Sequence, residues 1–232
     1  MATATVQKTK LRSDDIFFLA AALLILVIVV TGFAQSYFLA GMIRAKLPSA
    51  LVHVHGALFV AWIFLLVSQA SLVTFRKVKL HMTLGLLGFV LPPLMVVAGI
   101  LTLFASIRRG DLDIPPEILL AGDLENLVIF ILLVSWGMLA RRNGAFHKRL
   151  MILGTMAITG PAIDRWGFGL PLTIGVILVQ PILVLVYDLW SLRRVHRSTA
   201  VGTAMIVTAM LTVLPFSKLP FWQHFVSWIR QT

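Results

Sequence analysis

Apolar residues run along this chain in seven long stretches that are separated by short polar turns. The stretches cover residues 16–39, 51–75, 82–107, 118–140, 149–167, 169–190 and 199–217. A helix of about 20 apolar residues crosses the hydrocarbon core of a bilayer. The pattern therefore predicts an all-α fold, a polytopic transmembrane bundle of about seven helices over residues 16–217.

Composition supports a membrane protein. Hydrophobic residues make up 59% of the 232 and charged residues 12%, and the mean hydropathy is +0.96, far from the balance of a soluble domain. The absence of cysteine excludes disulfides, thiolate metal sites and cysteine nucleophiles. Near the end of the first apolar stretch, the small residues of Ala34-Gln35-Ser36 are followed by bulky Tyr37 and Phe38, which do not suit a signal peptidase site, so we interpret this stretch as an uncleaved anchor.

The net charge of +11 follows the membrane and needs no nucleic-acid partner to explain it. With the N-terminus inside, the inner loops would hold thirteen Lys and Arg residues and the outer loops seven. An excess of Lys and Arg marks the cytoplasmic side, which predicts that the chain runs N-in, C-out. The inner set is Lys8, Lys10, Arg12, Arg76, Lys77, Lys79, Arg141, Arg142, Lys148, Arg149, Arg193, Arg194 and Arg197.

Two tails flank the predicted bundle. Residues 1–15 are basic and form the predicted cytoplasmic tail. Residues 218–232 contain Trp222, Phe225, Trp228 and Ile229, a composition typical of an amphipathic segment that lies among the lipid headgroups.

An eight-residue pattern occurs twice. "HMTLGLLG" at 81–88 and "HKRLMILG" at 147–154 share four positions, and each follows a basic turn. The pattern predicts that helices two and three and helices four and five are a duplicated hairpin, related by a pseudo-twofold axis along the membrane normal. In the first copy, His81, Gly85, Gly88 and Pro92 form a small-residue stripe against which a helix or a flat cofactor can pack.

The inner end of the bundle would collect polar residues that can bind a cofactor. The candidates are His81, His147, His196 and Asp188. Imidazole is a common ligand of metals and haem iron, so His81 and His147 are predicted to share a haem b or a metal ion, with His196 as an alternative ligand and Asp188 as its orienter. The competing interpretation is a ring of headgroup-level histidines, with Asp188 bridging to loop bases.

A second polar cluster is predicted in the outer leaflet. The apolar runs of helices four and five are too short to cross the membrane, so the charged residues next to them must lie within the outer leaflet. Charged residues at that depth usually pair and often mark functional sites. The cluster would contain His55, Asp123, Glu125, Asp164 and Arg165. The alternative is a purely structural pair between Arg165 and a carboxylate. Gln69 and Gln180 are interpreted as hydrogen bonders between helices rather than as ligands.

The sequence resembles a family of uncharacterised bacterial inner-membrane proteins in a series of short motifs. In chain order these are HxHG, a following Trp and Gln, H-x-x-L-G, HKRLM, "DRW" and "YD". The resemblance covers the helices from the second to the sixth and implies no established activity. The residues that carry it are His55–Gly56, Trp62, Gln69, His81, Gly85, His147–Met151, Arg165–Trp166, Asp188 and His196. The H-x-x-L openings are also similar to those of membrane proteins linked to haem-copper oxidase assembly, and more loosely to b-type cytochromes. Dihaem cytochromes place axial histidines at both membrane sides, and here that would require His53 or His224 beside His55.

Three functions remain open from the sequence. The first is a membrane protein that handles haem or a metal in respiratory redox chemistry or oxidase assembly. The second is a non-catalytic accessory subunit that packs against a respiratory complex in the lipid bilayer. The third is a small-molecule transporter, because prolines interrupt the third and fifth predicted helices.

Overall fold

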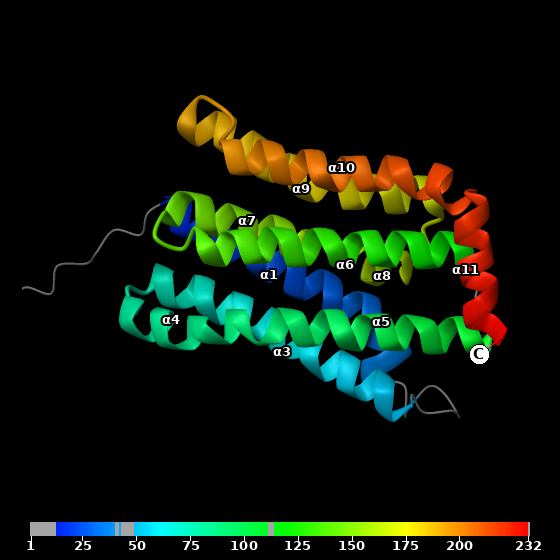
Figure 1. Cartoon of the computed structure of the whole chain (residues 1–232). Coiled ribbons are helices and arrows are strands. Elements are labelled where there is room, and N and C mark those ends of the chain that lie inside the picture. Colours follow the sequence, from blue (N-terminus) through cyan, green and yellow to red (C-terminus); the bar gives the residue numbers. More distant parts are fainter. Residues whose placement is uncertain (1–12, 40–41, 43–48, 111–113, 232) are drawn as a thin grey trace, which may run out of the picture.

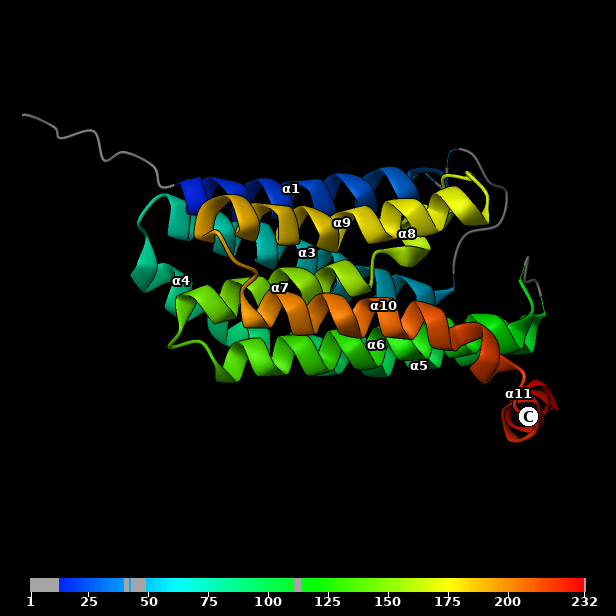
Figure 2. The same ribbon diagram turned by 90° about the horizontal axis from the view of Figure 1, so that it is seen from above.

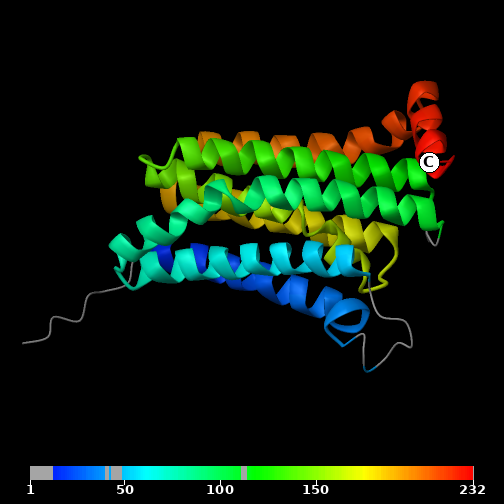
Figure 3. The same ribbon diagram turned by 60° about the horizontal axis from the view of Figure 1, so that its bottom comes forward.

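The computed structural model describes residues 13–39, 42, 49–110 and 114–231, and within them every regular element is helical. Figure 1 shows the long helices lying side by side along one direction, and the turned views in Figures 2 and 3 show the same arrangement. The predicted tail 1–15 lies outside the described residues except for its last three. The elements are α1 Ser13–Phe33, η1 Ala34–Phe38, α3 Ala50–Thr74, α4 Val78–Leu84, η2 Gly85–Phe89, α5 Leu91–Arg109, α6 Pro116–Leu139, α7 Gly144–Ala157, α8 Gly160–Asp164, α9 Leu170–Leu192, α10 Arg197–Ser217 and α11 Pro220–Gln231.

Six segments of the described chain are long and apolar enough to cross a membrane. They are Ser13–Phe38, Ala50–Thr74, Val78–Arg109, Pro116–Leu139, Leu170–Leu192 and Arg197–Ser217. Large apolar side chains on the outside of these helices, including Val27, Leu101 and Leu211, are more than half exposed, and lipid rather than water is the suitable neighbour for them. The chain is therefore a multi-pass membrane protein.

The segment 149–167, predicted as one helix, is broken. α7 ends at Ala157 and α8 begins at Gly160, and Thr159 lies between them. Pro161 stands at the start of α8 and lacks the N–H that would continue the ladder from α7. In Figure 2, α7 lies along α6 and α10 while α8 lies under α9, so the two pieces together return the chain from α6 to α9. The prediction of seven continuous helices was wrong at this place.

The third predicted helix, 82–107, is also not uniform. It consists of α4, the 3₁₀ segment η2 and α5, and Pro92 and Pro93 stand in the first turn of α5. Proline fits a first helical turn because the N–H it lacks would have no partner there. Gly85 and Gly88 lie within the 3₁₀ segment, where side chains follow a tighter spiral than in an α-helix.

α1 and α8 pack in very close contact. A Cβ atom placed on Gly32 would overlap the carbonyl of Ala162. Ile28, Ala162 and Ile163 form a small buried cluster around this contact. Beyond Gly32 the helix widens into the π-helical segment η1, as often occurs near functional sites.

The main core of the bundle contains buried residues of α1, α3, α5, α6, α7, α9 and α10. Trp62 of α3 is 1% exposed and packs edge-on against Phe130 of α6. Its indole N–H donates to Thr155 Oγ1 of α7 at 3.1 Å, so the buried polar group is satisfied. Trp136 of α6, the tryptophan in the first helix of the second hairpin, is 38% exposed. The two hairpins therefore differ in the burial of the tryptophan in their first helix.

α11 lies across the end of the bundle, at a steep angle to the other helices (Figures 1 and 2). Trp222, Val226 and Ile229 are buried in one apolar cluster with Ile107 of α5 and Leu120 of α6. The Trp222 indole donates to the Glu117 carbonyl at 2.9 Å. Phe221 and Trp228 remain exposed on the other side. This two-sided helix suits the predicted position among the headgroups.

The turns α3–α4, α6–α7 and α9–α10 lie at one end of the bundle (Figure 1), and these are the basic turns of the sequence. We therefore expect reporter fusions after Lys79, Arg142 and Arg194 to be cytoplasmic and fusions after Arg109 and Lys218 to be external, because basic residues are retained inside. Paired phosphatase and fluorescent-protein fusions measure this. A cytoplasmic reading at Lys218 alone would mean that α10 does not cross, whereas an external reading at Arg194 together with a cytoplasmic reading at Lys218 would mean that the broken segment α7–α8 does not cross.

Candidate functional site

The histidines of the repeated octapeptide face each other. His81 is the fourth residue of α4 and His147 the fourth residue of α7. Their ring centroids are 6.3 Å apart and the ring planes are nearly perpendicular, at 83°. His147 Nδ1 donates to the Gly137 carbonyl at 2.8 Å, which leaves Nε2 as the free nitrogen of a neutral ring. The structure thus brings together the two residues that the repeat singled out.

Polar atoms without hydrogen-bond partners occur on His81 and on Gln69, whose side chain lies beside Gly85. Among the described residues, His81 Nδ1 and both amide atoms of Gln69 are buried without a hydrogen-bond partner. Gln69 Oε1 is 3.5 Å from the position that a Cβ atom would take on Gly85. Buried polar atoms are normally satisfied by protein, water or an ion. The expectation that Gln69 bonds to a neighbouring helix was therefore wrong for the described chain, whereas Gln180 does donate to Thr159, at 2.9 Å.

The small-residue face of Gly85 and Gly88 is already covered. Gln69 lies over Gly85, and the thioether sulfur of Met138 is 3.0 Å from the Cβ position of Gly88. A flat cofactor laid on this face would require both side chains to move. A single ion between two imidazoles needs much less space and fits the arrangement better.

A buried ion pair lies at the same end of the bundle. Arg149 of α7 and Asp188 of α9 are 1% and 0% exposed. Arg149 donates from Nε and Nη2 to Asp188 Oδ1, at 2.9 and 2.5 Å, and from Nη1 to the Ala145 carbonyl at 3.0 Å. An ion pair at this burial is stable only with good geometry and additional hydrogen bonds, and both are present here.

The second oxygen of Asp188 fixes the start of α10. Oδ2 accepts from the Thr199 hydroxyl at 2.6 Å and from the His196 backbone N–H at 3.0 Å. His196 caps the helix, since its Nδ1 accepts from the Ser198 N–H at 3.3 Å. Burial lowers the pKa of His196, and the positive charge of Arg149 lowers it further, so the ring is neutral at pH 7.

The predicted set of His81, His147, His196 and Asp188 therefore divides into two clusters. In the part of the chain that the structure describes, no three His, Cys, Asp or Glu residues gather as a metal site. The oxygens of Asp188 accept hydrogen bonds from Arg149, from Thr199 and from the backbone N–H of His196. They therefore fix the ends of helices and do not orient His147 as a metal ligand. The competing interpretation was that Asp188 pairs with basic residues of the loops. Asp188 does pair with a basic residue, but this residue is the buried Arg149 and not an exposed loop residue.

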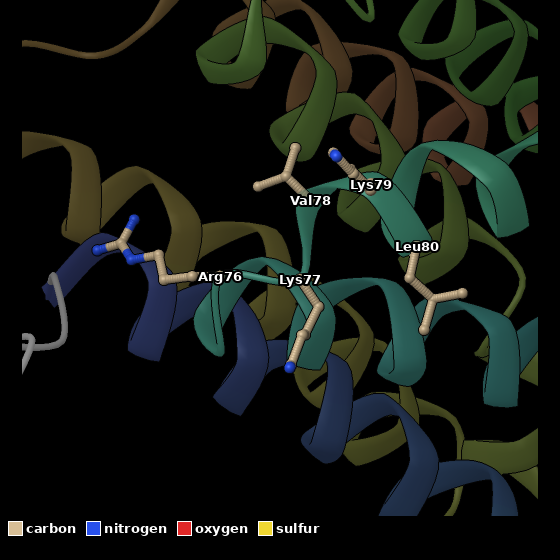
Figure 4. Close-up of a pocket in the computed structure, with 5 residues that line it drawn as sticks. All are labelled: Arg76, Lys77, Val78, Lys79 and Leu80. Atoms are coloured by element: carbon tan, nitrogen blue, oxygen red, sulfur yellow. The ribbon is translucent and has the colours of Figure 1, made fainter.

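Two further acidic residues link α1 to this end. Asp14 pairs with Lys148 and accepts from the Tyr187 hydroxyl at 3.0 Å. Asp15 pairs with Arg76 at 3.5 Å. A shallow hollow at the α3–α4 turn is lined by Arg76, Lys77, Val78, Lys79 and Leu80. Figure 4 shows that Lys77 and Lys79 point in different directions, so the hollow does not present converging groups to a ligand.

The outer cluster is partly assembled. Arg165 acts electrostatically on both Asp123 and His55, and Asp164 also acts on Asp123. The Arg165 guanidinium donates to the Pro161 carbonyl at 2.5 Å and lies 4.4 Å from the Phe33 ring centroid. Glu125 contacts a different helix and accepts from Thr212 of α10 at 3.2 Å. A salt bridge from Arg165 to a carboxylate stays a prediction.

His55 has no histidine partner of the kind that a dihaem cytochrome would need. Its ring lies 4.3 Å from that of Phe59, and its Nδ1 is buried without a partner among the described residues. His53 Nδ1 lies 3.3 Å from the Tyr37 hydroxyl. His224 lies on α11, with its Nδ1 2.8 Å from the Pro220 carbonyl.

Comparison with known proteins identifies no relative. No protein-family model, no curated protein and no solved structure matches this chain. The resemblance to a family of bacterial inner-membrane proteins therefore stays a prediction, and the geometry of the described residues has to carry any functional argument.

Proposed function

We propose that this membrane protein binds a metal ion between α4 and α7, with His81 and His147 as ligands. The facing of the two rings at 6.3 Å carries the proposal. Two imidazoles in trans on one ion have centroids about 6 Å apart, because each metal–nitrogen bond is about 2 Å long and the nitrogen lies about 1 Å from its ring centre. The hydrogen bond from His147 Nδ1 to Gly137 orients the free nitrogen, as outer partners of metal-bound histidines do.

Gln69 is the most suitable third group. Its carbonyl oxygen and its amide nitrogen lack partners, and the side chain reaches the Gly85 face beside His81. An ion or its bound water would satisfy the amide oxygen. Haem b is the other candidate ligand from the sequence, and it would require Gln69 and Met138 to swing away from the two glycines.

The biological setting of this site is inferred from the sequence. The basic turns lie at the end that holds His81 and His147, which supports a site near the cytoplasmic face, and the family resemblance supports a bacterial inner membrane. The similarity of the H-x-x-L openings to proteins of oxidase assembly favours respiratory metal or haem handling over other roles.

The test is the metal content and visible spectrum of protein purified in detergent without chelators. We expect about one metal equivalent per chain, reduced at least tenfold in His81→Ala and His147→Ala, because each variant removes one of two strong ligands. His224→Ala is the matched control, since His224 is an exposed histidine on α11. A Soret band would identify haem instead of a free ion.

A colourless, metal-free wild type, with His81 and His147 variants that behave like it, would overturn the proposal. That result would favour a non-catalytic accessory subunit. The repeated octapeptide would then reflect only the packing of two similar hairpins.

A further inference from the structure

A polar patch lies on the outer surface of the bundle, where α6 and α10 meet. Glu125 of α6 accepts from the Thr212 hydroxyl of α10 at 3.2 Å, and this contact is exposed. The same hydroxyl has one proton to donate, yet it also lies within bonding distance of the Thr208 and Ala209 carbonyls, at 2.9 and 3.0 Å. Among the described residues no other group bonds to the Glu125 carboxyl. The carboxyl therefore keeps acceptor capacity for a further donor.

The Thr208 side chain adds a second free polar group on this face, one helical turn from Thr212. Thr208 is exposed, and its hydroxyl has no hydrogen-bond partner in the part of the chain that the structure describes. Threonine hydroxyls inside helices often bond back to the carbonyl four residues earlier, as those of Thr74 and Thr155 do. The hydroxyl of Thr208 is therefore available both as a donor and as an acceptor.

Both groups lie at the depth of the hydrocarbon. At the usual rise per residue, Glu125 is about 4 Å from the middle of α6 and Thr208 about 2 Å from the middle of α10. The hydrocarbon core is about 30 Å thick, so it extends about 15 Å to either side of a centred helix. Lipid offers no hydrogen bonds at that depth, and carboxyl groups of spanning helices almost always face protein. A protein surface therefore suits this patch better than lipid does.

The patch is complementary to itself. A twofold axis along the membrane normal brings equal depths of two copies together, and the same surface then serves on both sides. Thr208 can bond to the Thr208 of a second copy, because a hydroxyl both donates and accepts. The Glu125 carboxyl beside it can accept from a hydroxyl of the second copy. A patch with acceptors alone would instead require a different protein that supplies a cation.

α10 is also accessible enough for such a contact. Together with α3 it is the least buried of the six spanning segments of the described chain. Ala204, Thr208 and Leu211 are exposed along its outer side. The side chains of Ala204 and Thr208 are small, so the backbone of a second α10 can approach closely enough for hydrogen bonds.

We propose that the outer face of α10 and the adjoining surface of α6 form the interface of a dimer of this protein in the membrane, with Glu125, Thr208 and Thr212 bonded across it. This interface does not depend on the proposed metal, whose ligands His81 and His147 lie on α4 and α7.

Cysteine crosslinking in native membranes tests which surface is used. The chain has no cysteine, so one introduced thiol reports a contact between copies, and a disulfide forms only between Cα atoms about 4–7 Å apart. With a membrane-permeant oxidant, Ala204→Cys and Leu211→Cys should each give a product of twice the mass of the chain. Leu101→Cys is the control and should stay monomeric, because Leu101 is exposed on α5 and α6 separates α5 from α10 (Figure 1).

Energy transfer between labelled copies in lipid vesicles, measured as the protein is diluted with lipid, gives the strength of the dimer. Thr208→Val and Glu125→Leu should each weaken dimerisation about tenfold, because each substitution removes hydrogen bonds in both copies and one such bond contributes modestly. Glu125→Gln keeps an acceptor and should stay within about threefold of the wild type. Ser68→Ala is the matched control and should change nothing, because it removes an exposed hydroxyl of α3.

Absence of the double-mass product from both cysteine variants, together with monomeric protein in vesicles, would overturn the proposal. Dimers that are as tight in Thr208→Val and Glu125→Leu as in the wild type would also overturn it, because another surface would then hold the copies together. A crosslinked product of any other mass would replace the second copy with a different membrane protein. If Glu125→Leu does not fold, Thr208→Val and the two cysteine variants decide the matter.

Discussion

Arg149→Met alone should destabilise the protein by about 3–5 kcal/mol, because it leaves Asp188 as an unpaired charge in a fully buried site. In a chain of this size that corresponds to a fall in Tm of about 10 °C. Thermal unfolding of detergent-purified protein, followed by tryptophan fluorescence, measures it. The double variant Arg149→Met with Asp188→Asn should recover most of the loss, since asparagine can still accept from Thr199 and the His196 N–H without carrying a charge.

Arg142→Leu is the control for this prediction. Arg142 belongs to the same basic end of the bundle but is exposed, so its loss should change Tm by no more than about 1–2 °C. Equal effects of Arg149→Met and Arg142→Leu would mean that the Arg149–Asp188 pair does not hold α7 to α9.

Gly32→Ala should destabilise the protein by about 1–3 kcal/mol. The added methyl would overlap the carbonyl of Ala162, a backbone atom that cannot rotate aside, so α1 and α8 would have to separate. The matched change Gly175→Ala in α9 meets open space and should be neutral or stabilising by up to about 1 kcal/mol. Thermal unfolding of both variants compares them directly. A Gly32→Ala protein as stable as Gly175→Ala would contradict the close packing of α1 and α8.

The long helices could be predicted from the sequence because their length is set by the thickness of the bilayer. The predicted stretches 118–140 and 199–217 agree with α6 and α10 to within two residues at each end. Hydrophobic length does not reveal backbone hydrogen bonding, so the π segment after α1 and the 3₁₀ segment after α4 were missed, and the fifth stretch was predicted as one helix interrupted by proline rather than as two helices. Pro161 was the visible signal for the break, since an interior proline removes a donor.

The candidate site was predicted unevenly for a similar reason. The equal positions of His81 and His147 after basic turns were enough to predict that they lie at one depth, and the structure brings their rings together. Arg149 was predicted to lie among the exposed basic residues of the cytoplasmic loops, because its neighbour Lys148 and the preceding basic turn are typical of a loop. Its burial depends on Asp188 and Thr199, which are distant in sequence and share no local pattern with it.

The broken segment also affects how the chain enters the membrane during synthesis. α7 is 14 residues long, about 21 Å at the usual rise, which is shorter than the hydrocarbon core of about 30 Å, and it carries Arg149 in addition. Neither α7 nor α8 would therefore partition into lipid alone. α6, which packs along α7 more extensively than any other pair of helices, is apolar enough to insert first. We therefore expect insertion of the segment 144–164 to depend on α6, and the Arg149–Asp188 pair can form only after α9 has been made.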